Sequence, residues 1–176
     1  MYKKIAFISL IILLMLVNWS IYNKEQHIKN GKVVYLKLAP VDPRSLMQGD
    51  YMALRFDIAN NIYDRLPKTE HYQGWQHNAD AKDGRVLVAL DDKDVASFVS
   101  LFSGQMLKEN ELILHYRVRN GAVKFATNAF FFEEGSAKIY EKAKYGEFRV
   151  NESGELLLVA MADEHVKLLF DNNRSF

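Results

Sequence analysis

The side chains best suited to binding a partner gather in one turn and the strand that follows it, residues 44–56. Gly49 can take the positive φ that closes a turn, and Asp50 can accept backbone N–H bonds within it. Arginine and tyrosine, which anchor protein interfaces well, flank this turn. We therefore predict a polar binding face, which later residues join if the fold brings them near. Its members are Arg44, Gly49, Asp50, Tyr51, Arg55, Tyr145 and Arg149.

The same segment also has a purely structural interpretation. On a strand, Met52, Leu54 and Phe56 share one face, and all three are apolar enough to lie in a core. Tyr51 and Arg55 then point to the other face, and no ligand is needed to explain them. We favour this scaffold interpretation over the binding face.

An enzyme is the less favoured alternative. Ser45 precedes Gly49 and Asp50 in an order that resembles membrane-anchored signal peptidases, which place a serine before a Gly-Asp turn and use a lysine base. The spacing is shorter here, and no lysine-bearing strand matches. A small-ligand-binding or hydrolytic domain, with its site at the rim formed by Gly49, Asp50 and Tyr51, remains the second hypothesis.

A polar stretch later in the chain holds residue types that bind zinc, namely His71, His77, Asp80 and Asp83. Their spacings belong to no recognised metal motif, and no second cluster accompanies them. A solvated loop explains them better. Phosphate loops, nucleophile elbows and dinucleotide fingerprints are also missing, so we expect neither a metal nor another cofactor.

The composition narrows the class of partner. The chain has 176 residues, with 23 lysines and arginines against 22 acidic residues, giving a formal charge of +1. Such a balance produces no field that would recruit nucleic acid. Cysteine is absent, which removes disulfides, thiolate nucleophiles and Cys-ligated zinc.

The N-terminus has the pattern of a transmembrane anchor. An apolar run from Ile5 to Val17 extends to Tyr22, near the lower length limit for crossing hydrocarbon. A cleaved signal peptide also fits this pattern, but residues 18–22 contain no A-x-A cleavage site, which favours an uncleaved anchor. Lys3 and Lys4 precede the helix without an acidic residue, so we expect the N-terminus inside and the rest of the chain outside.

This pattern divides the chain into an anchor (1–22), a polar stalk (23–31) and a single domain (32–176) outside the cytoplasm. In a Gram-negative bacterium the protein would be a single-pass protein of the inner membrane with its C-terminal domain in the periplasm. The partners expected are the membrane itself and another membrane protein.

Short strands dominate the predicted domain. The clearest sign is a hairpin in which residues 111–119 and 122–127 meet across Asn120 and Gly121, a dipeptide typical of type I′ turns. Residues 134–144 have helical spacing, and Phe130 to Phe132 resemble a buried strand. We predict a mainly β fold, an antiparallel sandwich or open barrel with one embedded α-helix, plus the N-terminal transmembrane helix.

The sequence Gly49-Asp-Tyr-Met-Ala-Leu-Arg-Phe56 resembles the GDYXXLXY family of uncharacterised membrane-anchored bacterial proteins. A second family-like block runs from Glu134 to Val150 and continues to Leu158. The resemblance implies an anchored envelope protein and brings no activity with it. Phe56 stands where the family pattern has Tyr, so no role that needs a hydroxyl is implied at this position.

Overall fold

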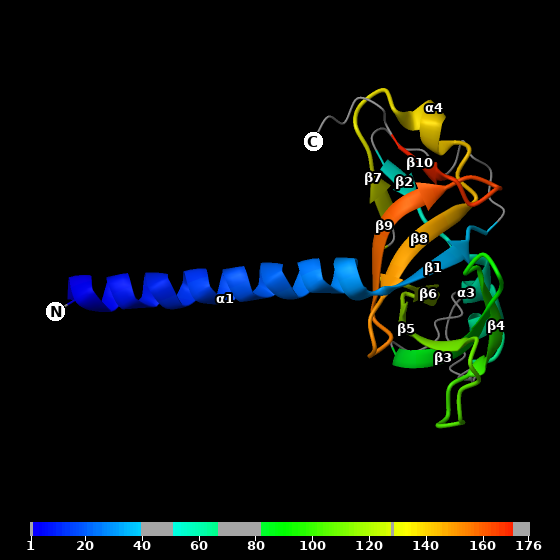
Figure 1. The fold of residues 1–176 in the computed structure, drawn as a ribbon, viewed down its shortest axis with the longest axis horizontal. Coiled ribbons are helices and arrows are strands. Elements are labelled where there is room, and N and C mark those ends of the chain that lie inside the picture. The colour runs from blue at the N-terminus through cyan, green and yellow to red at the C-terminus, as the bar shows by residue number, and fades with distance from the viewer. Residues whose placement is uncertain (1, 40–50, 67–81, 128, 171–176) are drawn as a thin grey trace, which may run out of the picture.

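The computed structural model describes residues 2–39, 51–66, 82–127 and 129–170. Its longest element is α1 (Tyr2–Asn30), a single helix that projects away from a β domain (Figure 1). At the usual rise, its 29 residues span about 44 Å, more than the roughly 30 Å of a hydrocarbon layer. The large apolar side chains between Ile5 and Tyr22 are exposed. Among the described residues, α1 is the one helix long and apolar enough to cross a membrane, and an N-terminal signal sequence shares both properties.

Residues 23–30, the predicted stalk, continue α1 as helix. A single residue, Gly31, separates the end of α1 from the first strand, β1 (Lys32–Lys37). The apolar helix and the β domain are therefore joined directly.

Beyond α1, the described residues form ten strands and two short helices. In addition to β1, these elements are β2 (Tyr51–Ala53), α3 (Asp57–Tyr63), β3 (Lys82–Leu90), β4 (Ala96–Leu101), β5 (Glu111–Arg119), β6 (Ala122–Lys124), β7 (Ala129–Phe131), α4 (Ala137–Tyr140), β8 (Tyr145–Val150), β9 (Leu156–Ala162) and β10 (Leu168–Leu169).

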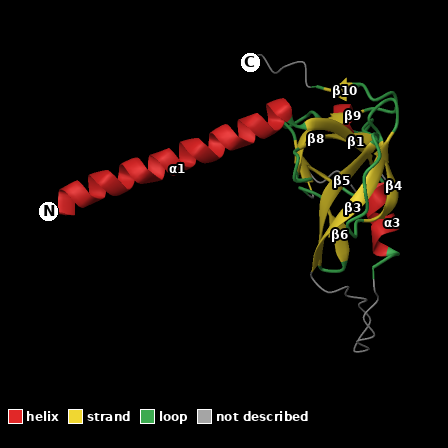
Figure 2. Ribbon diagram, turned by 60° about the horizontal axis from the view of Figure 1, so that its bottom comes forward, coloured by secondary structure: helices red, strands yellow, loops and turns green. Residues whose placement is uncertain are grey.

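Two curled four-stranded sheets form the body of the domain, with strand orders β1-β8-β9-β10 and β4-β3-β5-β6 (Figure 2). Tyr35 and Val95 form a bridge between β1 and the start of β4. On the other side, the N–H of His115 donates to the carbonyl of Gly154 at 2.8 Å. The two half-barrels thus meet at both margins, and the predicted antiparallel, mainly β fold is confirmed.

Local turn chemistry explains the hairpin between β5 and β6. Asn120 and Gly121 have φ values of 52° and 68°, the left-handed conformation that a type I′ turn requires at both positions. Arg117 to Arg119 pair with Ala122 to Lys124 in the expected register. The predicted turn is therefore confirmed, although the second strand ends at Lys124 and does not reach residue 127.

The two short helices differ in how well the sequence predicted them. α3 buries Ile58 and Ile62 and packs against β4 and β6. In the segment 134–144, only Ala137–Tyr140 is helical, so most of the helix predicted there is wrong. Gly135 has a positive φ of 87° before this turn, and pairing with β1 and β9 draws the chain into β8 from Tyr145.

The core lies between the half-barrels. Its fully buried side chains come from both sheets and from α3, and they include Val34, Leu36, Val86, Val88, Leu114, Val118, Phe148 and Ile62. At this core the motif strand meets the rest of the domain.

Candidate functional site

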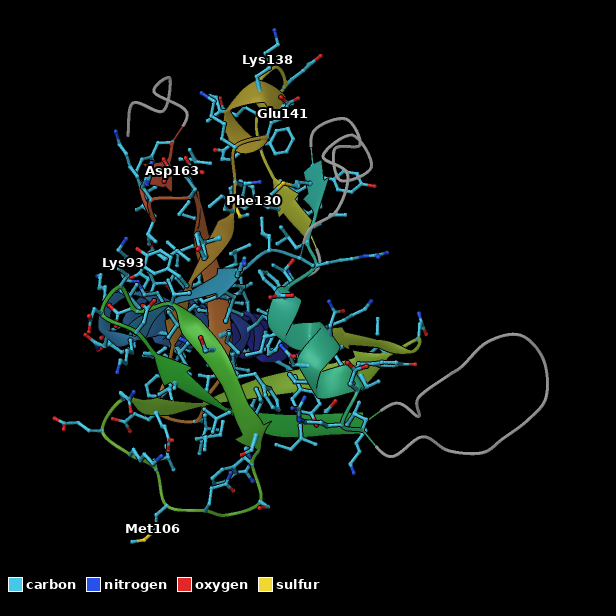
Figure 3. The ribbon with its side chains drawn as sticks, turned by 90° about the vertical axis from the view of Figure 1, so that its right-hand side faces the viewer. Lys93, Met106, Phe130, Lys138, Glu141 and Asp163 are labelled. Atoms are coloured by element: carbon cyan, nitrogen blue, oxygen red, sulfur yellow. The ribbon has the colours of Figure 1, made fainter. Side chains whose placement is uncertain are left out.

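The family motif forms a separate two-stranded ribbon. β2 pairs antiparallel with β7, and Tyr51 lies opposite Phe131 while Met52 lies opposite Phe130. The ribbon lies at the end of the domain that carries α4 (Figures 1 and 3). Because side chains alternate along each strand, these two pairs point to opposite faces.

The inner face of the ribbon belongs to the core. Met52 is buried, and the ring of Phe130 packs edge-on against the ring of Tyr140 at 5.0 Å. Leu54 is buried further along the chain. The predicted alternation of core residues along the motif is therefore confirmed.

The outer face of the ribbon is aromatic and open. The rings of Tyr51 and Phe131 lie 5.7 Å apart, and Phe131 is 71% exposed. The prediction that Phe130 to Phe132 form a buried strand is wrong at Phe131, because no described element covers this side of β7. The exposed ring is the feature that the sequence interpretation missed, because three consecutive phenylalanines do not show which ring the fold leaves uncovered.

The motif ends inside the core at Phe56. Its ring contacts those of Phe125 at 6.2 Å and Phe148 at 5.3 Å, both edge-on. A Cβ added at Gly146 would lie 3.3 Å from the Phe56 ring and 3.1 Å from the Phe148 ring. The glycine of the second family-like block thus makes room for the last residue of the motif.

Arg55 and Tyr145 flank the end of β1. The carbonyl of Arg55 accepts a 2.8 Å hydrogen bond from Ala39, and Tyr145 lies opposite Lys37. The two residues are therefore two strands apart and offset by two residues along the chain, about 12 Å at the usual strand spacing and rise. Arg55 is exposed and Tyr145 is partly buried.

Arg149 lies elsewhere. It is four residues beyond Tyr145 on β8, about 13 Å along the strand, where β8 meets the end of α1. Arg44, Ser45, Gly49 and Asp50 lie outside the described residues. The described members of the predicted binding face accordingly lie in three separate places. These are the ribbon, the end of β1, and the C-terminal end of α1 where it contacts β8, which we call the foot of α1.

A buried carboxylate lies near the foot of α1. Glu147 is 4% exposed and lies opposite Tyr35 in the β1–β8 pairing. The hydroxyl of Tyr35 donates to Glu147 Oε2 at 3.1 Å, and Nη2 of Arg149 lies 3.6 Å from Oε1. Burial, followed by the nearby carboxylate, raises the pKa of Tyr35 to about 12.

The same residues join the helix to the barrel. Nε2 of His27 hydrogen-bonds to the carbonyl of Arg149 at 3.0 Å, and Nη1 of Arg149 lies 3.5 Å from the carbonyl of Gly31. A Cβ at Gly31 would be only 2.5 Å from the carbonyl oxygen of His27. Nε of Arg149 is buried and, within the described part of the chain, has no hydrogen-bond partner. These contacts form a joint that holds the end of α1 against β8.

The described residues contain no group of three or more metal-ligating side chains. Of the predicted zinc ligands, His71, His77 and Asp80 lie outside the described residues. Asp83 is described, and it pairs with Arg119 at 2.7 Å on the surface of β3 and β5.

The protein is therefore a mainly β domain of two half-barrel sheets that follows an apolar N-terminal helix. The ribbon of β2 and β7 lies at one end of this domain. The family model of the GDYXXLXY protein matches residues 13–161, more than half of the chain. The chain belongs to the GDYXXLXY family. No curated protein and no solved structure matches it.

Proposed function

We propose that this chain is a single-pass envelope protein whose outer domain binds another membrane or periplasmic protein through the motif ribbon, without catalysis. In this proposal α1 stays uncleaved in the bacterial inner membrane. The β domain then lies in the periplasm.

The exposed aromatic face of the ribbon carries the proposal. Phe131 and Tyr51 present a contiguous apolar surface, and aromatic rings and arginines dominate the binding energy of protein interfaces. Arg55, four residues after Tyr51 in the same motif, adds an exposed charge to this part of the chain. Since Met52 fixes the ribbon from its inner face, the surface is held in place before a partner arrives.

The joint at the foot of α1 supports the membrane part of the proposal. The direct passage from α1 to β1 and the bond from His27 to Arg149 hold the domain in a set orientation on the helix. The polar end of α1, residues 23–30, is about 12 Å long. A domain held this close to the headgroups would meet partners that are themselves in or near the membrane.

Site-specific photocrosslinking in living cells tests the binding surface. A photoreactive phenylalanine analogue at position 131 of the full chain should give a discrete adduct with one partner. The matched control is position 106, because Met106 is 95% exposed on the loop between β4 and β5, at the end of the domain away from the ribbon (Figure 3). The adduct should weaken when Arg55→Ala is added.

Two results would count against the proposal. One is the same set of adducts at positions 131 and 106, which would mean that exposure alone determines crosslinking. The other is no adduct at position 131 in a chain that is stably present in the membrane.

A further inference from the structure

The face of α1 opposite its joint with the barrel is a strip of seven exposed residues, five of them apolar. Its members are spaced alternately by four and three residues, as in helices that pack side by side. They are Phe7, Ile11, Leu14, Asn18, Ile21, Glu25 and Ile28. We call this set the α1 seam.

Asn18 is the unusual member of the seam. It lies roughly 7 Å to the outer side of the midpoint of the apolar run, inside the expected hydrocarbon layer. Its Nδ2 donates to the carbonyl of Leu14 at 2.8 Å within the same helix. The Asn18 amide also has a second N–H and a carbonyl oxygen, and the lipid hydrocarbon contains no group that can hydrogen-bond to either of them.

Ile28 is the second unusual member. It is the only apolar residue in the polar end of the helix, residues 23–30, and it is 44% exposed. The seam therefore has an apolar residue beyond the membrane-spanning part of α1. In an isolated helix, an apolar side chain exposed to water at this position would add no stability.

The β domain leaves the seam uncovered. His27, which bonds to Arg149, lies nine residues after Asn18, or two and a half helical turns, and so on the opposite side of α1. Asn23 is on nearly the same side as His27. Both figures that show the whole helix place the domain at its end, with the helix shaft free along its length (Figures 1 and 2).

We infer that the α1 seam pairs with the seam of a second copy of this chain, with the two helices parallel and the two Asn18 side chains in contact. This inference rests on the membrane anchoring proposed above. Copies inserted in the same membrane have the same orientation, so two Asn18 side chains lie at the same depth. Because an amide is both donor and acceptor, a two-fold symmetric pair satisfies both.

The charges at the outer end are compatible with this pairing. Glu25 is a seam residue, and Lys29 lies 3.9 Å from it on the same helix. Lys24 is adjacent in the sequence. Two Glu25 side chains in a parallel pair would therefore be flanked by lysines of both copies.

The natural absence of cysteine makes the seam testable with single cysteines in the full chain. In native membranes, Ile21→Cys should form an oxidised dimer of twice the chain mass, whereas Asn23→Cys, at similar depth on the opposite side, should not. Adding Asn18→Ala to the Ile21→Cys chain should lower the crosslinked fraction about three- to tenfold, the range expected for one interhelical polar contact. Ser20→Ala, on the side away from the seam, should leave that fraction unchanged.

Equal crosslinking at positions 21 and 23, an unchanged yield with Asn18→Ala, or an adduct of another mass would overturn the self-pairing. Alkaline carbonate extraction of the same membranes separates this outcome from failure of the anchor. A chain that resists extraction but does not crosslink refutes only the seam. A chain that carbonate releases refutes the anchor as well.

Discussion

Replacing Gly146 with alanine tests how the motif strand is held in the core. A Cβ at this position would lie 3.1 Å from Cε2 of Phe148, 3.2 Å from Cδ1 of Leu158 and 3.3 Å from Cε1 of Phe56. All three contacts are tighter than ordinary van der Waals distance, and all three neighbours belong to the packed interior. The φ angle of Gly146 is not positive, so alanine adds no backbone strain.

Two effects of opposite sign set the size of the change. Replacing glycine with alanine stabilises by about 0.4–1 kcal/mol at an open, unstrained site, because it restricts the unfolded chain. Overpacking a filled core destabilises by about 1–3 kcal/mol. We expect overpacking to win here, with a net loss of about 1–2 kcal/mol in the free energy of unfolding.

A double-mutant cycle with Phe56→Leu assigns the crowding to the motif. Phe56→Leu alone should cost about 1–2 kcal/mol, since the ring that contacts Phe125 and Phe148 is lost. In the double variant the smaller side chain makes room for the new Cβ. The combined loss should therefore fall short of the sum by about 0.5–1.5 kcal/mol.

The measurement is denaturant unfolding of the full chain in detergent micelles, followed by near-ultraviolet circular dichroism of the aromatic side chains. This signal reports the packed domain, whereas far-ultraviolet dichroism would be dominated by α1. A Gly146→Ala variant as stable as the parent would refute the close packing. Strict additivity in the cycle would refute the role assigned to Phe56.

Three further predictions concern the ionisation of Tyr35, the joint between α1 and β8, and the membrane topology. Tyr35 is neutral when protonated and its pKa is raised from 10.0 to about 12 in the folded state, so its contribution to stability is full below pH 10 and is lost as the pH rises toward 12. After allowance for solvent screening we expect a loss of about 1 kcal/mol between these limits, absent in Tyr35→Phe; identical alkaline unfolding curves for the two chains would contradict this. Gly31→Ala should push the new Cβ against the carbonyl of His27 and speed tryptic cleavage at Lys29 or Lys32; a cleavage rate equal to that of the parent chain would exclude a tight joint. A reporter that is active only outside the cytoplasm, fused after Phe176, should be active, and a silent but stably expressed fusion would reverse the proposed orientation.

Features controlled by neighbouring residues could be predicted from the sequence. The turn at Asn120 and Gly121 followed from its dipeptide, because positive φ at both positions is a local requirement. The alternation of Met52, Leu54 and Phe56 followed from strand geometry in the same way. The apolar run of α1 was equally plain.

Features controlled by pairing over long sequence distances could not be predicted. Glu147 looks like an ordinary surface residue of a strand until β8 pairs with β1 and places Tyr35 opposite it. Similarly, Phe131 is exposed because no described element packs on the outer side of β7. The hydrophobicity of residues 130–132 could not indicate this. Long-range pairing also explains why the helix predicted over 134–144 is short, because β8 pairs with β1 and β9 from Tyr145 onward.

The motif that names the family therefore has two distinct parts. Leu54 and Phe56 are buried, and their packing against Gly146 and its neighbours explains them as scaffold. Tyr51 begins the strand on the outer face of the ribbon beside Phe131, where core packing explains neither ring fully. If the motif served only the scaffold, Tyr51 and Phe131 should tolerate polar substitution with little loss of stability or function. The binding proposal expects the opposite for function alone, so a folded, membrane-inserted variant that has lost its partner is the result that separates the two parts of the motif.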